Sequence, residues 1–211
     1  MKVSIAMPVS YPSLNPMGTQ ALAIAASTGG PQALLALFAQ IKGGLNGVPI
    51  FITQHMPASF TALLAEQLSK AGGRVCAEAK GGEAVIPGNA YLAPGDYHMV
   101  AERNAAGKVI LRLNQDPPEN FCRPAADPML RSLSRVYGSH LAVAVLTGMG
   151  QDGLEGAREA VRQGGAVIAQ DAASCVVYGM PKAVADQRLC KAIMPLSEMG
   201  QYLIEQIDGR R

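Results

Sequence analysis

Short apolar runs alternate with amphipathic segments along most of the chain. Residues 21–26 are wholly apolar, and Leu34, Leu37, Phe38 and Ile41 then recur at helical spacing. This is the pattern of a buried strand that leads into a helix. The alternation continues, and it predicts strands at 48–53, 74–79, 141–146 and 166–170 and helices around 60–68, 129–137, 154–163 and 196–207. Apolar strands alternating with helices indicate an α/β fold with a mostly parallel sheet and helices on both faces.

Two segments depart from this alternation. Residues 84–113 are broken by glycines and carry short apolar runs at 98–101 and 109–113, which predicts a small antiparallel hairpin beside the sheet. Residues 1–20 contain three prolines and show no sustained period, so we expect an N-terminal arm or linker remnant there. The rest of the chain, 21–211, is expected to form one domain, because 211 residues is a usual single-domain length.

Composition narrows the class of protein. The net charge is only +2, and the chain has no Trp and four Phe, which argues against a nucleic-acid partner. No secretory signal peptide is visible, and no apolar run approaches the roughly 18 residues of a membrane span. The four cysteines form no close pair and have no His at zinc spacing, so we expect reduced thiols, no metal and a cytoplasmic protein.

The first candidate site follows the strand at 21–26. Ser27 and Thr28 precede Gly29 and Gly30, which let the backbone approach a ligand closely. A hydroxyl there faces the N-terminus of the next helix, whose free N–H groups suit a developing oxyanion. The alternative is that Ser27 or Thr28 is a plain helix N-cap.

The second candidate is His55, directly after the strand at 48–53. An imidazole at a strand end is placed to act as a general base near neutral pH. The alternative is an ordinary surface or core histidine. We expect a structural role for the other two histidines, His98 and His140, because neither has an evident helper.

The third candidate is the glycine-rich loop Gly148–Gly153, which contains Asp152 and follows the strand at 141–146. Its glycines also match the dinucleotide fingerprint Gly-x-Gly-x-x-Gly, and Asp171 follows at close to the spacing of the ribose-binding acid, about 20 residues. Asp152 is then either a carboxylate that orients an imidazole or part of a dinucleotide loop.

These candidates converge if the sheet is parallel, because the carboxyl ends of its strands meet at one edge. Ser27, His55 and Asp152 then form a possible nucleophile, base and acid, since an unassisted serine is a weak nucleophile and needs both partners. Spacing alone leaves this triad and the dinucleotide site both open.

The segments that carry these residues resemble the CheB family, the chemotaxis protein-glutamate methylesterases and glutamine deamidases. The resemblance covers residues 21–193, with weaker similarity at 91–96 and at Arg123-Pro124 before Asp127. Four motifs carry it, in the family's order: Ala26-Ser27-Thr28-Gly29-Gly30, Thr53-Gln54-His55-Met56-Pro57, Leu146-Thr147-Gly148-Met149-Gly150 with Asp152-Gly153, and Ala173-Ser174-Cys175-Val176-Val177-Tyr178-Gly179-Met180-Pro181.

The resemblance implies a doubly wound sheet and a serine hydrolase that needs no cofactor. It places the nucleophile on Ser27, the general base on His55 and the acid on Asp152. The expected substrates are γ-glutamyl methyl esters, and also Gln side chains, on chemoreceptor helices. We expect the N–H groups of Thr28 and Met149 to form the oxyanion site. Arg123 either pairs with acidic substrate groups or forms a structural salt bridge.

Some features depart from the family. Gln151 stands where Asn is more usual, and Cys122 and Ala125 replace a His and a Ser often seen there. The family's regulatory receiver domain is expected to be absent from this chain, either because this is an excised catalytic domain or because it is a stand-alone relative. Two alternatives are a non-enzymatic receptor-docking module of the same fold and an NAD-binding oxidoreductase that uses Gly148–Gly153.

Overall fold

The computed structural model describes residues 11–14 and 18–209. Within them, seven strands form one parallel sheet: β1 (Ala21–Ala26), β2 (Ile50–Gln54), β3 (Cys76–Glu78), β4 (Ala90–Leu92), β7 (Leu141–Val145), β8 (Ala166–Gln170) and β9 (Cys190–Met194). Their order is β3-β4-β2-β1-β7-β8-β9, so β1 is central and the chain winds outward from it in both directions. The predicted α/β class and doubly wound parallel sheet are confirmed.

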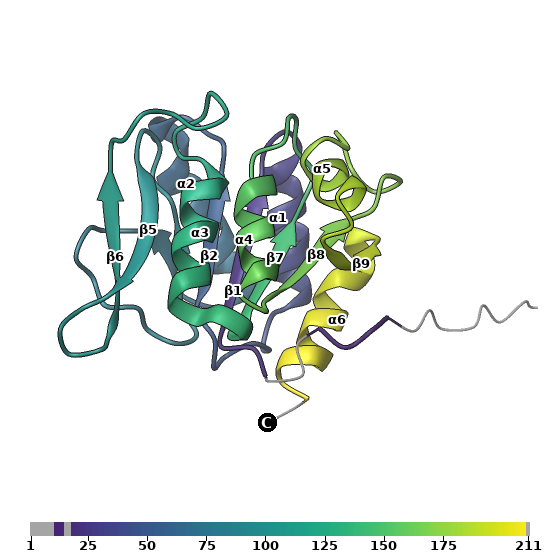
Figure 1. Cartoon of the computed structure of the whole chain (residues 1–211), viewed down its shortest axis with the longest axis horizontal. Coiled ribbons are helices and arrows are strands. Elements are labelled where there is room, and N and C mark those ends of the chain that lie inside the picture. The colour runs from purple at the N-terminus through teal and green to yellow at the C-terminus, as the bar shows by residue number, and fades with distance from the viewer. Residues whose placement is uncertain (1–10, 15–17, 210–211) are drawn as a thin grey trace, which may run out of the picture.

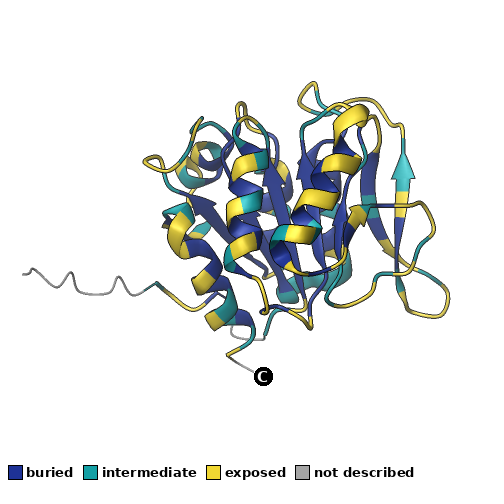
Figure 2. Ribbon diagram, turned by 180° about the vertical axis from the view of Figure 1, so that it is seen from behind, coloured by how far each residue is buried: buried dark blue, intermediate teal, exposed yellow. Residues whose placement is uncertain are grey.

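Six α-helices cover the two faces of the sheet: α1 (Gly30–Gln40), α2 (Ala58–Gly72), α3 (Ala126–Tyr137), α4 (Leu154–Arg162), α5 (Met180–Asp186) and α6 (Leu196–Ile207). Helices α1, α2 and α6 share one core cluster, and α3, α4 and α5 share the other. In Figure 1, α3 and α4 lie in front of the sheet and α1 lies behind it. Figure 2 shows the strands buried and the outer helix faces exposed, as a three-layer fold requires.

The two faces of β1 show how the sequence builds these layers. Successive side chains of a strand point to opposite faces. Leu22 and Ile24 therefore pack toward α1, while Ala23 and Ala25 pack toward α3. Small residues also bring α3 and α4 together, because a Cβ at Gly156 of α4 would overlap the Leu130 side chain of α3.

The predicted hairpin is also present, as β5 (His98–Arg103) and β6 (Val109–Asn114), paired antiparallel beside α3. The backbone N–H of Ala101 in β5 donates to the Ser132 hydroxyl of α3 at 3.0 Å, which attaches the hairpin to that helix. The hairpin therefore lies on the α3 side of the molecule.

Three elements escape the sequence pattern. Strand β4 has only three residues and α5 only seven, too few to show a period. Strand β9 lies at the edge of the sheet and alternates buried and exposed residues, including Lys191, so it lacks the continuous apolar run of the central strands. The strand expected at 74–79 is shorter, at Cys76–Glu78.

The described part of the expected N-terminal arm packs on the domain. Leu14 is fully buried in the α6 cluster, and its N–H donates to Gln206 Oε1 at 3.0 Å. The Tyr11 hydroxyl donates to the Glu198 carboxylate at 2.7 Å. Residues 1–10 and 15–17 of that predicted arm lie outside the described residues.

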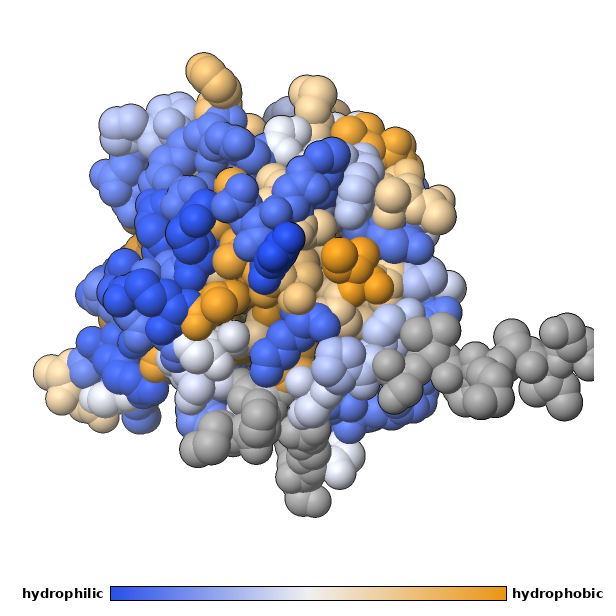
Figure 3. Space-filling view, turned by 45° about the vertical axis from the view of Figure 1, so that its right-hand side comes forward, coloured by the Kyte–Doolittle hydropathy of each residue, from blue (hydrophilic) through white to orange (hydrophobic). Residues whose placement is uncertain are grey.

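The surface is mixed. Figure 3 shows hydrophobic residues in separate patches among hydrophilic ones. In residues 11–14 and 18–209, none of the helices is both long enough and apolar enough to cross a membrane.

Replacing Leu14 by Ala is expected to lower the free energy of unfolding by about 2–5 kcal/mol, the usual cost of deleting a fully buried leucine. Urea denaturation of the whole chain measures it. Val75→Ala, at a site that is 60% exposed, is the control and should change stability by less than about 0.5 kcal/mol. If Leu14→Ala matches that control, residues 11–14 do not stabilise the domain.

Candidate active site

Ser27 and His55 come together because β1 and β2 are neighbours in the sheet. Ala26 pairs with Gln54, so Ser27 and His55 each lie one residue beyond the paired ends. The His55 N–H donates to the Ala26 carbonyl at 3.2 Å. Ser27 and His55 line the same cavity of about 510 Å³, which also contains Thr28. The predicted convergence of these strand ends is present in the structure.

The Gln54 side chain links the ends of β1 and β2, which lie far apart in the sequence. Its buried amide Nε2 donates to the carbonyl oxygens of both Ser27 and His55, each at 3.0 Å. A single side chain therefore ties the backbone of the candidate nucleophile to the backbone of the candidate base. The residue that holds the His55 backbone in place is therefore its own neighbour in the motif, Gln54.

The third residue, Asp152, follows β7 and is bonded to His55. The distance from His55 Nε2 to Asp152 Oδ2 is 2.6 Å, and the Asp152 side chain is only 1% exposed. An ionised carboxylate can only accept a hydrogen bond, so Nε2 carries the proton and Nδ1 offers the lone pair. Nδ1 contacts the Cys122 sulfur at 3.4 Å, and within the described residues no hydrogen bond joins it to the Ser27 hydroxyl.

Backbone and side-chain donors surround the Asp152 carboxylate. The N–H groups of Ala126 and Asp127, in the first turn of α3, donate at 2.5 and 3.1 Å, and the Asn120 amide donates at 3.2 Å. Burial raises the pKa of Asp152, but the hydrogen bonds from His55 and Ala126 outweigh it and leave the pKa below its usual value. The positive end of a helix thus holds this carboxyl in its ionised form.

A second buried carboxyl, Asp127, lies beside Asp152. It accepts the Gly156 N–H at 2.7 Å and the Asn120 amide at 2.9 Å. Burial, together with the nearby Asp152 charge, raises the pKa of Asp127 to about 6. Sequence reasoning did not assign a role to Asp127, Asn120 or Cys122. The available signals were the weak family similarity at Arg123-Pro124 before Asp127 and the position of Cys122 where a His is often seen.

The candidate oxyanion donors lie at the edge of this site. In the part of the chain that the structure describes, neither the Thr28 N–H nor the Met149 N–H has a hydrogen-bond partner. Met149 is exposed, and Gly148 packs so closely that a Cβ would lie 2.8 Å from that of Ser27. This arrangement leaves both N–H groups available, and their role as an oxyanion site remains a prediction.

Arg123 forms a structural salt bridge. Its guanidinium binds the Asp96 carboxylate at 2.6 Å and donates to the carbonyl oxygens of Gln115 and Asp116 at 3.0 and 3.2 Å. The hydrogen bond to Arg123 lowers the pKa of Asp96. Of the two roles expected for Arg123, the structure shows this one. A contact with substrate stays a prediction.

The glycine-rich loop is used internally rather than left open for a dinucleotide. Asp152 is buried against His55, and Asp171 accepts the N–H and the hydroxyl of Ser174 at 2.9 and 2.6 Å. A Cβ at Gly148 would overlap the Met180 sulfur, so packing accounts for that glycine. These contacts favour the interpretation of Asp152 as the acid partner of His55.

The other two histidines have ordinary structural surroundings, and the cysteines form no disulfide. Buried His98 receives the Ala125 N–H at 3.2 Å and contacts the Pro117 carbonyl at 3.2 Å, and His140 contacts the Gly18 carbonyl at 2.9 Å. All four cysteines are free. In residues 11–14 and 18–209, no group of three or more His, Cys, Asp or Glu side chains could hold a metal ion.

Comparison with known proteins identifies the family. The family described as CheB methylesterase matches this chain over residues 22–203. A protein-glutamate methylesterase/protein-glutamine glutaminase of Azospirillum brasilense is 55% identical over 183 residues, which are 86% of this chain and 46% of that protein. One from Paramagnetospirillum magneticum is 50% identical over 198 residues, 94% of this chain and 52% of that protein. The chain thus spans about half the length of these curated relatives.

A solved structure gives the same result. The Thermotoga maritima CheB methylesterase catalytic domain superposes with a TM-score of 0.85 at 37% identity, over 90% of this chain and 99% of that one. It shares the fold that brings Ser27, His55 and Asp152 to one edge of the sheet. The chain therefore belongs to the CheB methylesterase family.

Proposed function

We propose that this chain is a serine hydrolase that removes methyl groups from γ-glutamyl methyl esters on chemoreceptor proteins. The observation that carries the proposal is the hydrogen bond from His55 to the buried carboxylate of Asp152, with His55 itself lining the same cavity as Ser27. The names of its relatives support it, since both are called protein-glutamate methylesterases. Their second named activity, protein-glutamine glutaminase, uses the same chemistry on an amide.

In the first half of the reaction, His55 Nδ1 removes the proton from the Ser27 hydroxyl. The Ser27 oxygen then forms a bond to the ester carbonyl carbon, and the π electron pair of the carbonyl bond moves to the carbonyl oxygen. The oxyanion re-forms the carbonyl and expels the methoxy group, which takes the proton from His55 and leaves as methanol. Asp152 stabilises the imidazolium throughout, because its carboxylate accepts the Nε2 proton.

In the second half, His55 takes a proton from water, which attacks the acyl-Ser27 ester. Collapse of this intermediate releases the glutamate side chain and returns the proton to Ser27. With a glutamine substrate, ammonia leaves in place of methanol. The Thr28 and Met149 N–H groups are our candidates for stabilising the oxyanion, and one such donor is typically worth about 10²–10³ in rate.

The cavity suits a side chain presented by a protein surface rather than a small free molecule. It is lined by Phe60 and Leu63 of α2, which are 55% and 54% exposed, together with Met56. Apolar side chains at the rim can pack against a helix while its ester reaches Ser27. We therefore propose helical segments of methylated chemoreceptors as the substrate, and a regulatory receiver domain as a further partner outside this chain.

Ser27→Ala is expected to abolish methanol release from methylated chemoreceptor membranes, because the nucleophilic oxygen is lost. Methanol is quantified with purified chain, and circular dichroism confirms that the variant is folded. Ser69→Ala is the matched control: its hydroxyl donates to the Arg74 carbonyl, away from the cavity. Equal release by wild type and Ser27→Ala would show that Ser27 is not the nucleophile.

Asp152→Asn is expected to lower kcat on the order of 10³–10⁴-fold, since an amide can donate to the imidazole and favour the wrong tautomer. Initial rates of methanol release measure the change. Asp186→Asn, at an exposed carboxyl paired with Lys182, is the control and should retain full activity. A loss of less than tenfold in Asp152→Asn would contradict the role given to this carboxylate.

A further inference from the structure

A tight turn, Glu119–Cys122, lies against both His55 and Asp152. The Cys122 N–H donates to the Glu119 carbonyl at 2.9 Å, and the Glu119 N–H donates back at 3.2 Å. Its two central residues, Asn120 and Phe121, have φ angles of +50° and +63°. Positive φ at both central positions is the type I′ pattern, which suits Asn but is unfavourable for a bulky Phe. The surroundings must therefore hold the turn in this conformation.

The turn touches the acid and the base with different residues. The Asn120 amide Nδ2 lies between two buried carboxyls, 3.2 Å from Asp152 Oδ1 and 2.9 Å from Asp127 Oδ2. At the other end, the Cys122 sulfur lies 3.4 Å from His55 Nδ1. One short segment is thus in contact with both members of the catalytic pair.

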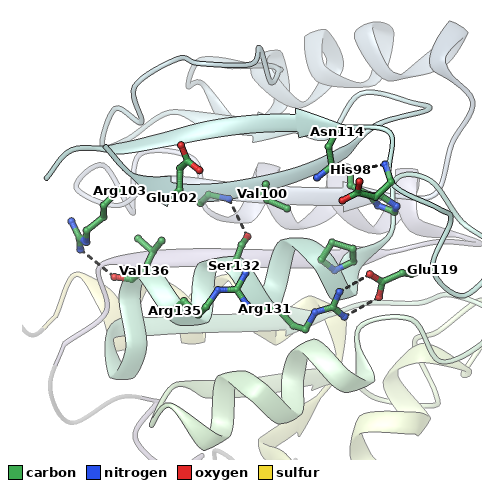
Figure 4. Close-up of a pocket in the computed structure, with 13 residues that line it drawn as sticks. His98, Val100, Glu102, Arg103, Asn114, Glu119, Arg131, Ser132, Arg135 and Val136 are labelled. Atoms are coloured by element: carbon green, nitrogen blue, oxygen red, sulfur yellow. Dashed lines mark hydrogen bonds and ion pairs between the residues drawn. The ribbon is translucent and has the colours of Figure 1, made fainter. Parts of the chain in front are cut away.

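An ion pair anchors the turn to α3. Arg131 donates from both terminal nitrogens to the two carboxylate oxygens of Glu119, at 2.8 and 2.5 Å. Figure 4 shows this pair at one end of a cavity of about 680 Å³ between α3 and the β5–β6 hairpin. A partly exposed pair adds little stability, but a two-pronged guanidinium–carboxylate contact sets direction as well as distance. It places Asn120 over the N-terminal turn of the same helix.

We propose that Asn120 is a positioning residue for Asp152, held over the two carboxyls by the Glu119–Arg131 pair. The inference rests on the proposed function, in which Asp152 must stay ionised and aimed at His55. The Asn120 amide supplies a side-chain donor to both carboxyls at once. It therefore offsets the repulsion between Asp127 and Asp152 and fixes the orientation of the Asp152 carboxylate.

The direction of a pH effect follows from the groups around Asp152. Its titratable and charged neighbours are His55 after β2, Cys122 in the turn, and Asp127 and Arg131 of α3. The Asn120 amide donates to the ionised forms of both carboxyls and so lowers their pKa. Without the amide, both pKa values rise. Asp152 then becomes protonated at a higher pH and can no longer accept the His55 proton.

The first test replaces Asn120 by Gly, which adopts positive φ readily and removes the side chain together with its amide donor. We expect kcat to fall roughly ten- to hundredfold, the range for a lost hydrogen bond to a charged group, with KM little changed. The acidic limb of the kcat–pH profile should move to higher pH, because a carboxylate that loses a hydrogen-bond donor is protonated more easily. Asn120→Asp keeps the shape but adds a third carboxylate, so both changes should be larger. Asn46→Gly, at an exposed turn, is the control.

The second test weakens the anchor. Glu119→Gln removes the charge that holds Arg131 and should shift kcat and the pH profile in the same direction by a smaller amount. Glu102→Gln is a matched control, because it breaks another ion pair of the surface, between Glu102 and Arg112. Glu102 also lines the same cavity as Glu119. Its kinetics should match the wild type.

A third readout does not depend on turnover. The proton between His55 Nε2 and Asp152 Oδ2 is followed at low field in ¹H NMR spectra, and Asn120→Gly should shift or broaden its signal while Asn46→Gly leaves it unchanged. If the wild type does not release methanol, the proposed function fails, and this signal still tests the positioning. Wild-type kcat, pH profile and low-field signal in Asn120→Gly would overturn the inference.

Discussion

The proposed active site depends on keeping one buried carboxylate ionised. Asp152 is almost fully enclosed, and burial alone would raise its pKa and favour the neutral acid. A neutral acid could not hold the His55 Nε2–H in the tautomer that leaves Nδ1 basic. The fold meets this requirement with hydrogen-bond donors: the first N–H groups of α3, the Asn120 amide and the imidazole itself all point at the same carboxylate.

The architecture explains why those donors meet. Because β1 is central and the chain winds away from it on both sides, the carboxyl ends of β1, β2 and β7 lie side by side. Ser27 and His55 follow the first two strands, and the loop after β7 carries Asp152. Helix α3 packs on the same face of the sheet as α4, and the N-terminus of α3 therefore lies beside the loop that carries Asp152. The turn before α3 also contacts the acid, because the Asn120 amide donates to Asp152.

Much of this could be predicted from the sequence, and the part that could not has a physical reason. Periodicity and turn chemistry locate Ser27 and His55, which stand directly after apolar strands, and Asp152, which lies in the glycine-rich loop after β7. The family motifs indicate their roles. Asn120 and Asp127 have no such local signal, because their function comes from contacts with a loop some 25 residues or more along the chain. The sequence alone leaves two roles open for Arg123, because its ion-pair partner, Asp96, lies far away in the chain. Strand β4 and helix α5 were too short to show a period.

The central claim concerns a proton on one nitrogen, and ¹⁵N NMR of the imidazole tests it most directly. The chain has only three histidines, so a His55→Gln variant assigns the His55 signals by difference. Neutral His55 is expected to carry its proton on Nε2, toward Asp152, and to leave Nδ1 unprotonated. A proton on Nδ1 in the neutral ring, with Nε2 bare, would contradict it, because the proposed mechanism needs an unprotonated Nδ1 as the general base.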